Sequence, residues 1–304
     1  MNAPPELLTL RDWLRWAVSR FGEAKLVFGH GTNNAYDEAA YLILHTLHLP
    51  LDRLDPFLDA RLTAAERGDL AALFARRIDE RIPAAYLTGE AWLGDFRFHV
   101  DPRVLIPRSY IAQLLPDGLA PYVGDAAAVR SALDLCTGSG CLAILMAHAY
   151  PAADVDAVDL SVDALTVAQR NVLEYGLAGR VNLLRSDMFA NLRDKRYDLI
   201  ISNPPYVTAN AMAALPAEYL HEPAQALAGG DDGLDAVRII LDEAARYLNP
   251  RGTLVVEVGN AREPVEATFP RLPFVWLSTP SSSDAVFLLK REDLESDSTY
   301  RAAR

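Results

Sequence analysis

Apolar residues in the first third of the chain recur at the spacing of helices. The stretch LLTLRDWLRWAVSRF places Leu10 and Leu14 on one helical face, and YDEAAYLILHTLHL repeats the pattern. A third stretch, TAAERGDLAALFARRIDERI, opens with Thr63 and Glu66, the pair that forms a capping box at the start of a helix. We therefore expect residues 1–90 to form a small helical domain whose helices pack on one another.

The next forty positions change rhythm. FRFHVDPRVLI alternates like a strand, turns at Asp101-Pro102 and returns through Val104 to Ile106, which predicts a hairpin. PRSYIAQLL predicts a short helix, and PDGLAPYVGDAAAVRSA shows no period. Residues 91–130 are therefore expected to form a β-hairpin and a linker.

Beyond residue 131, apolar runs of strand length alternate with amphipathic stretches. Strands are expected at 132–136, 154–159, 180–185, 197–202 and 252–258, and helices at 140–149, 161–175, 232–247 and 261–269. This alternation predicts an α/β fold in which helices cover both faces of a parallel sheet.

The end of the sheet has a different connection. Only PSSSD separates FVWLST from AVFLLK, and no crossover helix fits in that gap, so these two strands must be antiparallel. A seven-stranded sheet with an antiparallel last strand is the outline of class I, Rossmann-like methyltransferases and differs from the dehydrogenase fold. We expect this domain at residues 131–291 and a mobile tail at 292–304.

Composition narrows the class of protein. The 304 residues are 51% hydrophobic, enough for two domains and a large core. No apolar run reaches bilayer length, the N-terminus lacks a signal pattern, and the two cysteines, Cys136 and Cys141, provide no disulfide framework. We expect a cytoplasmic protein. His45 and His48 lack other ligand types at suitable spacing, so no metal is expected.

The net charge of −12 bears on the partner. An acidic surface repels phosphate backbones, which makes nucleic acid a poor default partner. A basic protein fits the sign better.

The stretch LDLCTGSGCLAI predicts a strand, a glycine turn and a helix. Gly138 and Gly140 let the backbone approach a ligand, and the helix N-terminus offers free N–H groups. With Ala143 the spacing also matches the dinucleotide fingerprint. The turn therefore predicts a nucleotide-type ligand but does not distinguish a dinucleotide from another ligand of this type.

Two carboxylates follow the next strands. Asp159 stands about 20 residues beyond the glycines, where it can bind ribose hydroxyls, and Ser161 is the better helix cap. Asp187 can accept from an adenine amino group, although a plain turn aspartate fits the sequence nearly as well.

The motif NPPY follows the apolar run YDLIIS. Its two prolines stiffen the backbone, aim the side chain of Asn203 and leave carbonyl groups free to accept hydrogen bonds. The Asn203 amide oxygen and the Pro204 carbonyl can hold two N–H groups while Tyr206 packs against a flat substrate. This arrangement favours methyl transfer to nitrogen, in which positioning supplies much of the rate.

The motifs NPPY, LDLCTGSGC and VDLS together resemble the glutamine N5-methyltransferases that use S-adenosylmethionine. The resemblance covers nearly the whole chain, from the helical domain through YLTGEAWLGDFRFHVDPRVLIPRS to VVEVGN, and the stretches LPAEYLHEPAQALAGGDDGLDAVRIIL and VLIPRSYIAQLL are similar to the PrmB type. That type modifies a glutamine in the third large-subunit ribosomal protein, and its sister type modifies peptide release factors. The helical domain at 1–90 would then recognise the substrate.

The resemblance implies roles for the matching residues. The methionine part of the cofactor would lie against Cys136, Thr137, Gly138, Ser139 and Gly140, its ribose against Asp159, and its adenine against Asp187 and Met188. The glutamine amide would be held by Asn203, Pro204, Pro205 and Tyr206, with Asn203, Pro204 and Tyr206 catalytic and Asn203 also bordering the cofactor.

Two positions depart from the family pattern. Tyr110 replaces an expected proline and Gln113 an expected glutamate, in a segment expected near the cofactor. Arg108 beside them is equally well explained as an ion-paired arginine.

Three further functions stay open from the sequence. These are glutamine methylation of release factors, N-methylation of a nucleobase in DNA or RNA, and cofactor binding without catalysis in an assembly factor. The acidic charge opposes the second, and the intact motif set opposes the third.

Overall fold

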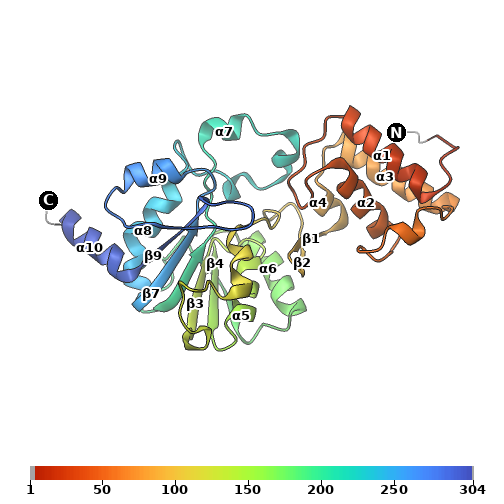
Figure 1. The fold of residues 1–304 in the computed structure, drawn as a ribbon. Coiled ribbons are helices and arrows are strands. Elements are labelled where there is room, and N and C mark those ends of the chain that lie inside the picture. The colour runs from red at the N-terminus through yellow and green to blue at the C-terminus, as the bar shows by residue number, and fades with distance from the viewer. Residues whose placement is uncertain (1–3, 303–304) are drawn as a thin grey trace.

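A computed structural model describes residues 4–302 of the chain, with side chains through residue 296. The helical domain lies at one end of the molecule and the C-terminal helix at the other (Figure 1). Its helices are α1 (Leu10–Glu23), α2 (Ala35–Thr46), α3 (Ala64–Asp79) and the short α4 (Ala84–Thr88). Capping boxes open α1 and α3, the second at Thr63 and Glu66, so the helices expected in this part are confirmed.

A seven-stranded sheet forms the second domain. Its strands are β3 (Ser131–Leu135), β4 (Asp154–Asp159), β5 (Val181–Arg185), β6 (Tyr197–Ser202), β7 (Leu248–Glu257), β8 (Val275–Leu277) and β9 (Val286–Lys290). Their order is β5-β4-β3-β6-β7-β9-β8, and only β9 runs antiparallel to its neighbours. The expected Rossmann-like methyltransferase sheet is confirmed.

Helices cover both faces of this sheet. On one face lie α5 (Cys141–Ala149) and α6 (Val162–Glu174), and on the other α8 (Asp235–Tyr247), α9 (Arg262–Thr268) and α10 (Arg291–Ala302). Neighbouring strand residues point to opposite faces, so Ala132 joins the first core and Leu133 the second. Residues that follow β3, β4, β5 and β6 line a cavity at the carboxyl ends of these strands.

The predicted hairpin was wrong in its pairing. Strand β1 (Glu90–Leu93) pairs with β2 (Phe96–His99), and Gly94 turns between them with φ +60°. The chain passes Asp101-Pro102 without returning to pair, because its backbone bonds elsewhere: Val104 O accepts from the Tyr86 hydroxyl and Ile106 N donates to Glu222 Oε1. PRSYIAQLL contributes only a 3₁₀ turn, Ile111–Gln113.

Two segments expected to be loose are packed. In the expected linker, Leu119 and Val123 are buried in the core that includes α5. As far as residue 302, the tail expected at 292–304 continues as α10, in which Leu294 is 3% exposed against α8 and β7, and residues 303–304 lie outside the described residues. Scattered apolar residues without a clear period gave no signal for this packing. Across residues 4–302, no helix has the length and apolar character to cross a membrane.

Candidate active site

The glycine turn between β3 and α5 brings bare backbone to the edge of the sheet. Gly140 precedes α5 with φ +80°, and a Cβ at this position would lie 3.2 Å from the Cβ of Ala168. Gly138 has φ +54° with open space around it, and its N–H donates to Asp159 Oδ2 at 2.9 Å. Gly140 therefore serves helix packing, while Gly138 remains accessible to a ligand.

Two carboxylates fix this turn. Asp134 is fully buried and accepts from Thr137 Oγ1 at 2.6 Å and from Ala143 N at 3.1 Å. Burial raises its pKa to about 7 against these hydrogen bonds. Asp159 accepts from Gly138 N and from Ser161 N, each at 2.9 Å, and burial raises its pKa as well. Ser161 caps α6, as expected.

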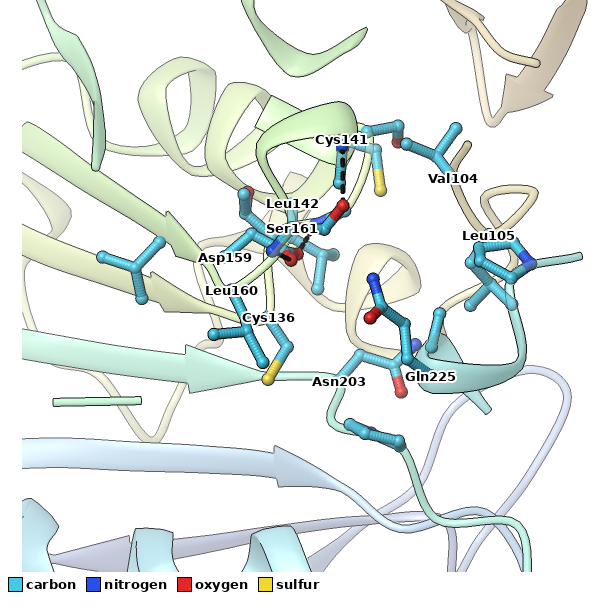
Figure 2. Close-up of a pocket in the computed structure, with 18 of the residues that line it drawn as sticks. Val104, Leu105, Cys136, Cys141, Leu142, Asp159, Leu160, Ser161, Asn203 and Gln225 are labelled. Carbon is cyan, nitrogen blue, oxygen red and sulfur yellow. Dashed lines mark hydrogen bonds between the residues drawn. The ribbon is translucent and has the colours of Figure 1, made fainter. Parts of the chain in front are cut away.

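A cavity, here called the strand-end cavity, opens above the ends of β3 to β6. Its wall includes most of the expected cofactor residues: Cys136, Thr137, Gly138, Ser139, Asp159, Asp187, Met188 and Asn203. In Figure 2, Asp159 and Ser161 lie on one side of this cavity, and Asn203 and Gln225 on the other. Gly140 is not part of the wall. Gln225, which the sequence did not single out, projects its amide into the cavity (Figure 2).

A second cavity, here called the interdomain cavity, lies between the sheet domain and the helical domain. Its wall takes residues from 29–33, 92–93, 105–113, 203–207 and 215–227 and from Ser281, among them Asn203, Pro204 and Tyr206. Both cavities share the residues Leu105, Pro107, Arg108, Ser109, Asn203 and Ala226. Pro205 lines the strand-end cavity instead of the interdomain cavity. The NPPY motif thus stands where the two cavities meet.

Two glycines pack closely against Tyr206. A Cβ on Gly259 would lie 2.8 Å from the Tyr206 ring, and a Cβ on Gly233 would lie 2.5 Å from its carbonyl oxygen. No side chain fits at either place. The AGGDDG stretch therefore shapes the backbone around the motif.

Glu257 ends β7 and connects Tyr206 to the segment before the short 3₁₀ turn. Its Oε2 accepts from Ser109 Oγ at 2.5 Å and Tyr110 N at 2.8 Å, and its Oε1 accepts from the Tyr206 hydroxyl at 3.4 Å. Burial raises the pKa of Glu257 to about 7, although these hydrogen bonds oppose the shift. This residue was not singled out from the sequence. Its position as a lone carboxylate within the apolar run VVEV could have indicated a buried polar contact.

Arg108 is ion-paired. Its guanidinium donates to both oxygens of Glu222, at 2.6 and 2.7 Å, and stacks 5.5 Å from the ring centre of Tyr219. Glu222 also accepts from Ile106 N and lies 3.4 Å from His30 Nε2. Burial alone would raise the pKa of Glu222, but the contacts with His30 and Arg108 lower it to about 2. The structure supports the ion-paired interpretation of Arg108, and adds that Arg108 borders both cavities while Glu222 is buried behind it.

The two family departures face the interdomain cavity. Tyr110 and Gln113 line this cavity and are absent from the wall of the strand-end cavity. Gln113 Nε2 donates to Ser281 Oγ at 3.1 Å. Pro107, Arg108 and Ser109 of the same segment line both cavities, so the segment lies between them, with Tyr110 and Gln113 on the interdomain side.

Glu218, four residues before Glu222 in the stretch that follows NPPY, connects this stretch to the helical domain. Glu218 is 1% exposed and accepts from Val27 N at 3.1 Å, Arg81 Nη1 at 3.1 Å and Arg77 Nη1 at 3.4 Å. Glu218 and Glu222 stand one helical turn apart in the stretch that follows NPPY. The wall of the interdomain cavity is thus held in place by buried ion pairs.

The cysteines are packing residues. Both are free, and Cys136 Sγ lies 3.8 Å from Met188 Sδ. Burial raises the pKa of the Cys136 thiol and that of Cys141, the latter to about 12, so neither forms a reactive thiolate.

Comparisons with known proteins give the family. Residues 119–231 match the family described as "Methyltransferase small domain". The chain is 59% identical to the ribosomal protein uL3 glutamine methyltransferase of Neisseria gonorrhoeae, over 96% of this chain and 98% of the relative. It is 52% identical to the protein of the same name from Bradyrhizobium diazoefficiens, over 95% of this chain and 93% of the relative.

Solved structures resemble the chain less closely. A methyltransferase from Pyrococcus furiosus has a TM-score of 0.46 and 17% identity, covering 64% of this chain and 88% of its own. A ribosomal protein L11 methylase from Lactobacillus delbrueckii subsp. bulgaricus has a TM-score of 0.40 and 18% identity, covering 59% and 74%. The assignment depends instead on identity along nearly the whole sequence: the chain belongs to the family of ribosomal protein uL3 glutamine methyltransferases.

Proposed function

We propose that this protein transfers a methyl group from S-adenosylmethionine to the side-chain amide nitrogen of a glutamine in ribosomal protein uL3. The observation that carries the proposal is the position of Asn203 on the wall that the two cavities share. An amide at that point can touch a cofactor on one side and a substrate on the other. The names of the relatives supply the glutamine and uL3.

The strand-end cavity suits S-adenosylmethionine. The open backbone at Gly138 and the carboxylates of Asp159 and Asp187 fit a ligand with hydroxyl, amino and cationic groups. The carboxylates of Asp159 and Asp187 would repel a phosphate, and the Gly138 N–H that a phosphate would need already donates to Asp159 Oδ2. The donor set therefore favours this cofactor over a phosphate-rich dinucleotide.

The interdomain cavity would hold the glutamine amide. S-adenosylmethionine supplies a methyl group on a positively charged sulfur, which is a strong electrophile. The amide nitrogen is a poor nucleophile because its lone pair is delocalised. Hydrogen bonds from its N–H groups to the Asn203 side chain and the Pro204 carbonyl would favour a pyramidal nitrogen, while Tyr206 packs against the amide plane.

The proton must leave as the methyl group arrives. A nitrogen–carbon bond forms, the carbon–sulfur bond breaks, and the nitrogen then releases one proton. Among the described residues, those that line the interdomain cavity include no carboxylate, imidazole or amine. We therefore assign the proton to water.

Charge supports a basic substrate. The net charge of −12 attracts a basic chain over a Debye length of about 8–10 Å. Methyl transfer to uL3 should therefore slow as salt rises, mostly through slower association.

The test uses labelled S-adenosylmethionine and four acceptors: free unmethylated uL3, the assembled large subunit, a release factor and duplex DNA. Mass spectrometry should place one methyl group on one glutamine of free uL3. Transfer to the release factor alone would change the substrate and keep the chemistry. Transfer to DNA alone would overturn the function.

A further inference from the structure

A groove lies between the helical domain and the β1–β2 hairpin, and the methyl-transfer chemistry does not use it. This hairpin groove is lined largely by apolar side chains, among them Tyr41, Pro50, Leu51, Ala91 and Trp92. Leu51 is 38% exposed and Trp92 is 41% exposed, high values for two large apolar residues facing the same hollow. Adjoining exposed apolar side chains in a concavity are typical of a binding site.

The groove has a fixed shape. Glu90 Oε1 accepts from Trp92 Nε1 at 3.2 Å and from the Tyr41 hydroxyl at 3.3 Å, and Arg97 holds Glu90 Oε2 at 3.3 Å. These bonds join the hairpin to α2 and hold the indole in place. A preformed wall loses little entropy when it receives a ligand.

The groove continues into the interdomain cavity. Gly31 and Trp92 line both hollows, so the two are neighbours along one surface. Gly31 is exposed, and the space where a Cβ would stand is open to 4 Å. A polypeptide whose glutamine enters the interdomain cavity can therefore run past Gly31 into the groove.

We propose that the hairpin groove binds an apolar side chain of uL3, on the stretch of chain beside the methylated glutamine. This inference rests on the proposed function, because it takes uL3 as the occupant. Of the two carboxylates that line the groove, Glu90 is paired with Arg97, whereas Asp52 is 81% exposed, 4.0 Å from Arg53 Nε, and is the one that a basic chain can reach. The occupant therefore carries an apolar anchor within a basic stretch, and Trp92 is the enzyme residue against which it packs.

The test compares Leu51→Asp with the wild type. Leu51 lines the groove without bordering either of the other cavities, and its exposure lets the variant fold. We expect the KM for uL3 to rise about tenfold, the effect of 1.4 kcal/mol of lost binding. The kcat at saturating uL3 and the Kd for S-adenosylmethionine should stay unchanged. Leu173→Asp is the matched control, since Leu173 is 59% exposed on α6 and should change nothing.

A short peptide separates this role from a structural one. A peptide that contains the glutamine but too few residues to reach the groove should be methylated equally by wild type and Leu51→Asp. Equal penalties for peptide and uL3, or no penalty for uL3, would overturn the groove assignment. If the wild type methylates no uL3 at all, the proposed function fails. Binding of fluorescent uL3 without cofactor then decides the groove, because equal affinity for wild type and variant rejects it and weaker binding by the variant supports it.

Discussion

The two cavities that meet at Asn203 are built in different ways. The strand-end cavity takes most of its wall from residues that directly follow four adjacent strands, β5, β4, β3 and β6. These residues belong to the short sequence motifs from which the cofactor site was expected. The interdomain cavity collects six segments from both domains, which are joined by contacts between distant residues. The pair of Arg108 and Glu222, for example, spans 114 positions.

This difference separates a general part from a specific part. The strand ends of a parallel sheet meet at one edge whatever the rest of the chain does, so the cofactor side follows from the fold. The substrate side depends on long-range contacts of the stretch that follows NPPY, in which Glu218 bonds to the helical domain and Glu222 pairs with Arg108. Substitutions should therefore divide into those that affect the cofactor, those that affect the substrate, and those at the shared wall that affect turnover.

The largest effect on turnover is expected at the shared wall. Asn203→Ala should lower kcat about a hundredfold to a thousandfold, as the loss of one preorganised polar contact does elsewhere. The Kd for S-adenosylmethionine should change less than threefold, roughly 0.6 kcal/mol. Single-turnover methyl transfer and calorimetry measure the two quantities. Asn210→Ala, at an exposed position in α7 (Ala209–Ala213), is the control. Intact turnover would reduce the NPPY motif to a turn.

The second effect tests the long-range part of the comparison. Arg108→Ala leaves the buried carboxylate of Glu222 without its bidentate partner. We expect the free energy of unfolding to fall by about 3 kcal/mol, as for other broken buried pairs. Arg103→Ala removes an exposed pair with Asp101 and should cost less than about 1 kcal/mol. Urea titrations compare the two variants, and equal losses would mean that the Glu222 pair is not special.

The same division explains what could be predicted from sequence. The sheet, its antiparallel end and the positions of Asp159 and Asn203 follow from short patterns, because a strand and its following turn are local. Glu222 and Gln225 carried no local signal, since their surroundings come from segments far along the chain. The hairpin prediction was wrong because the alternation in FRFHVDPRVLI continues beyond His99. The strand that pairs with Phe96–His99 is Glu90–Leu93, which comes before it in the sequence.

A third variant tests the cofactor side alone. Asp159→Ala removes a carboxylate from the strand-end cavity and two hydrogen bonds from the glycine turn. Affinity for S-adenosylmethionine should fall by about 1.5–3 kcal/mol, the range for a hydrogen bond to a charged group. Binding of uL3 without cofactor should be unchanged. Asp163→Ala, exposed in the first turn of α6, is the control. Unchanged calorimetric affinity in a folded variant would remove Asp159 from the cofactor site.

The smallest effect concerns Glu257, which lines neither cavity and bonds to Ser109 and Tyr206 behind the wall between them. Its pKa of about 7 lies above the usual 4.5 because of burial, so the folded protein binds a proton there that the unfolded chain releases. The stabilising effect of this proton is complete below pH 4.5 and is lost as the pH rises through 7. Ionisation has the opposite effect on the site, because a carboxylate accepts from Tyr206 and Ser109 better than a carboxyl does.

We therefore expect the kcat of the wild type to fall about threefold to tenfold as the pH drops below 7, the size of one net hydrogen bond. Asp134 also has a raised pKa of about 7, so the profile alone does not identify the group. Glu257→Gln identifies it: the variant should keep a reduced kcat that no longer changes near pH 7. Glu263→Gln, exposed in α9, should keep the wild-type profile. If the inflection survives in Glu257→Gln, its source is one of the two carboxylates that fix the glycine turn, Asp134 or Asp159, whose pKa values burial also raises, and the pH dependence belongs to the cofactor side.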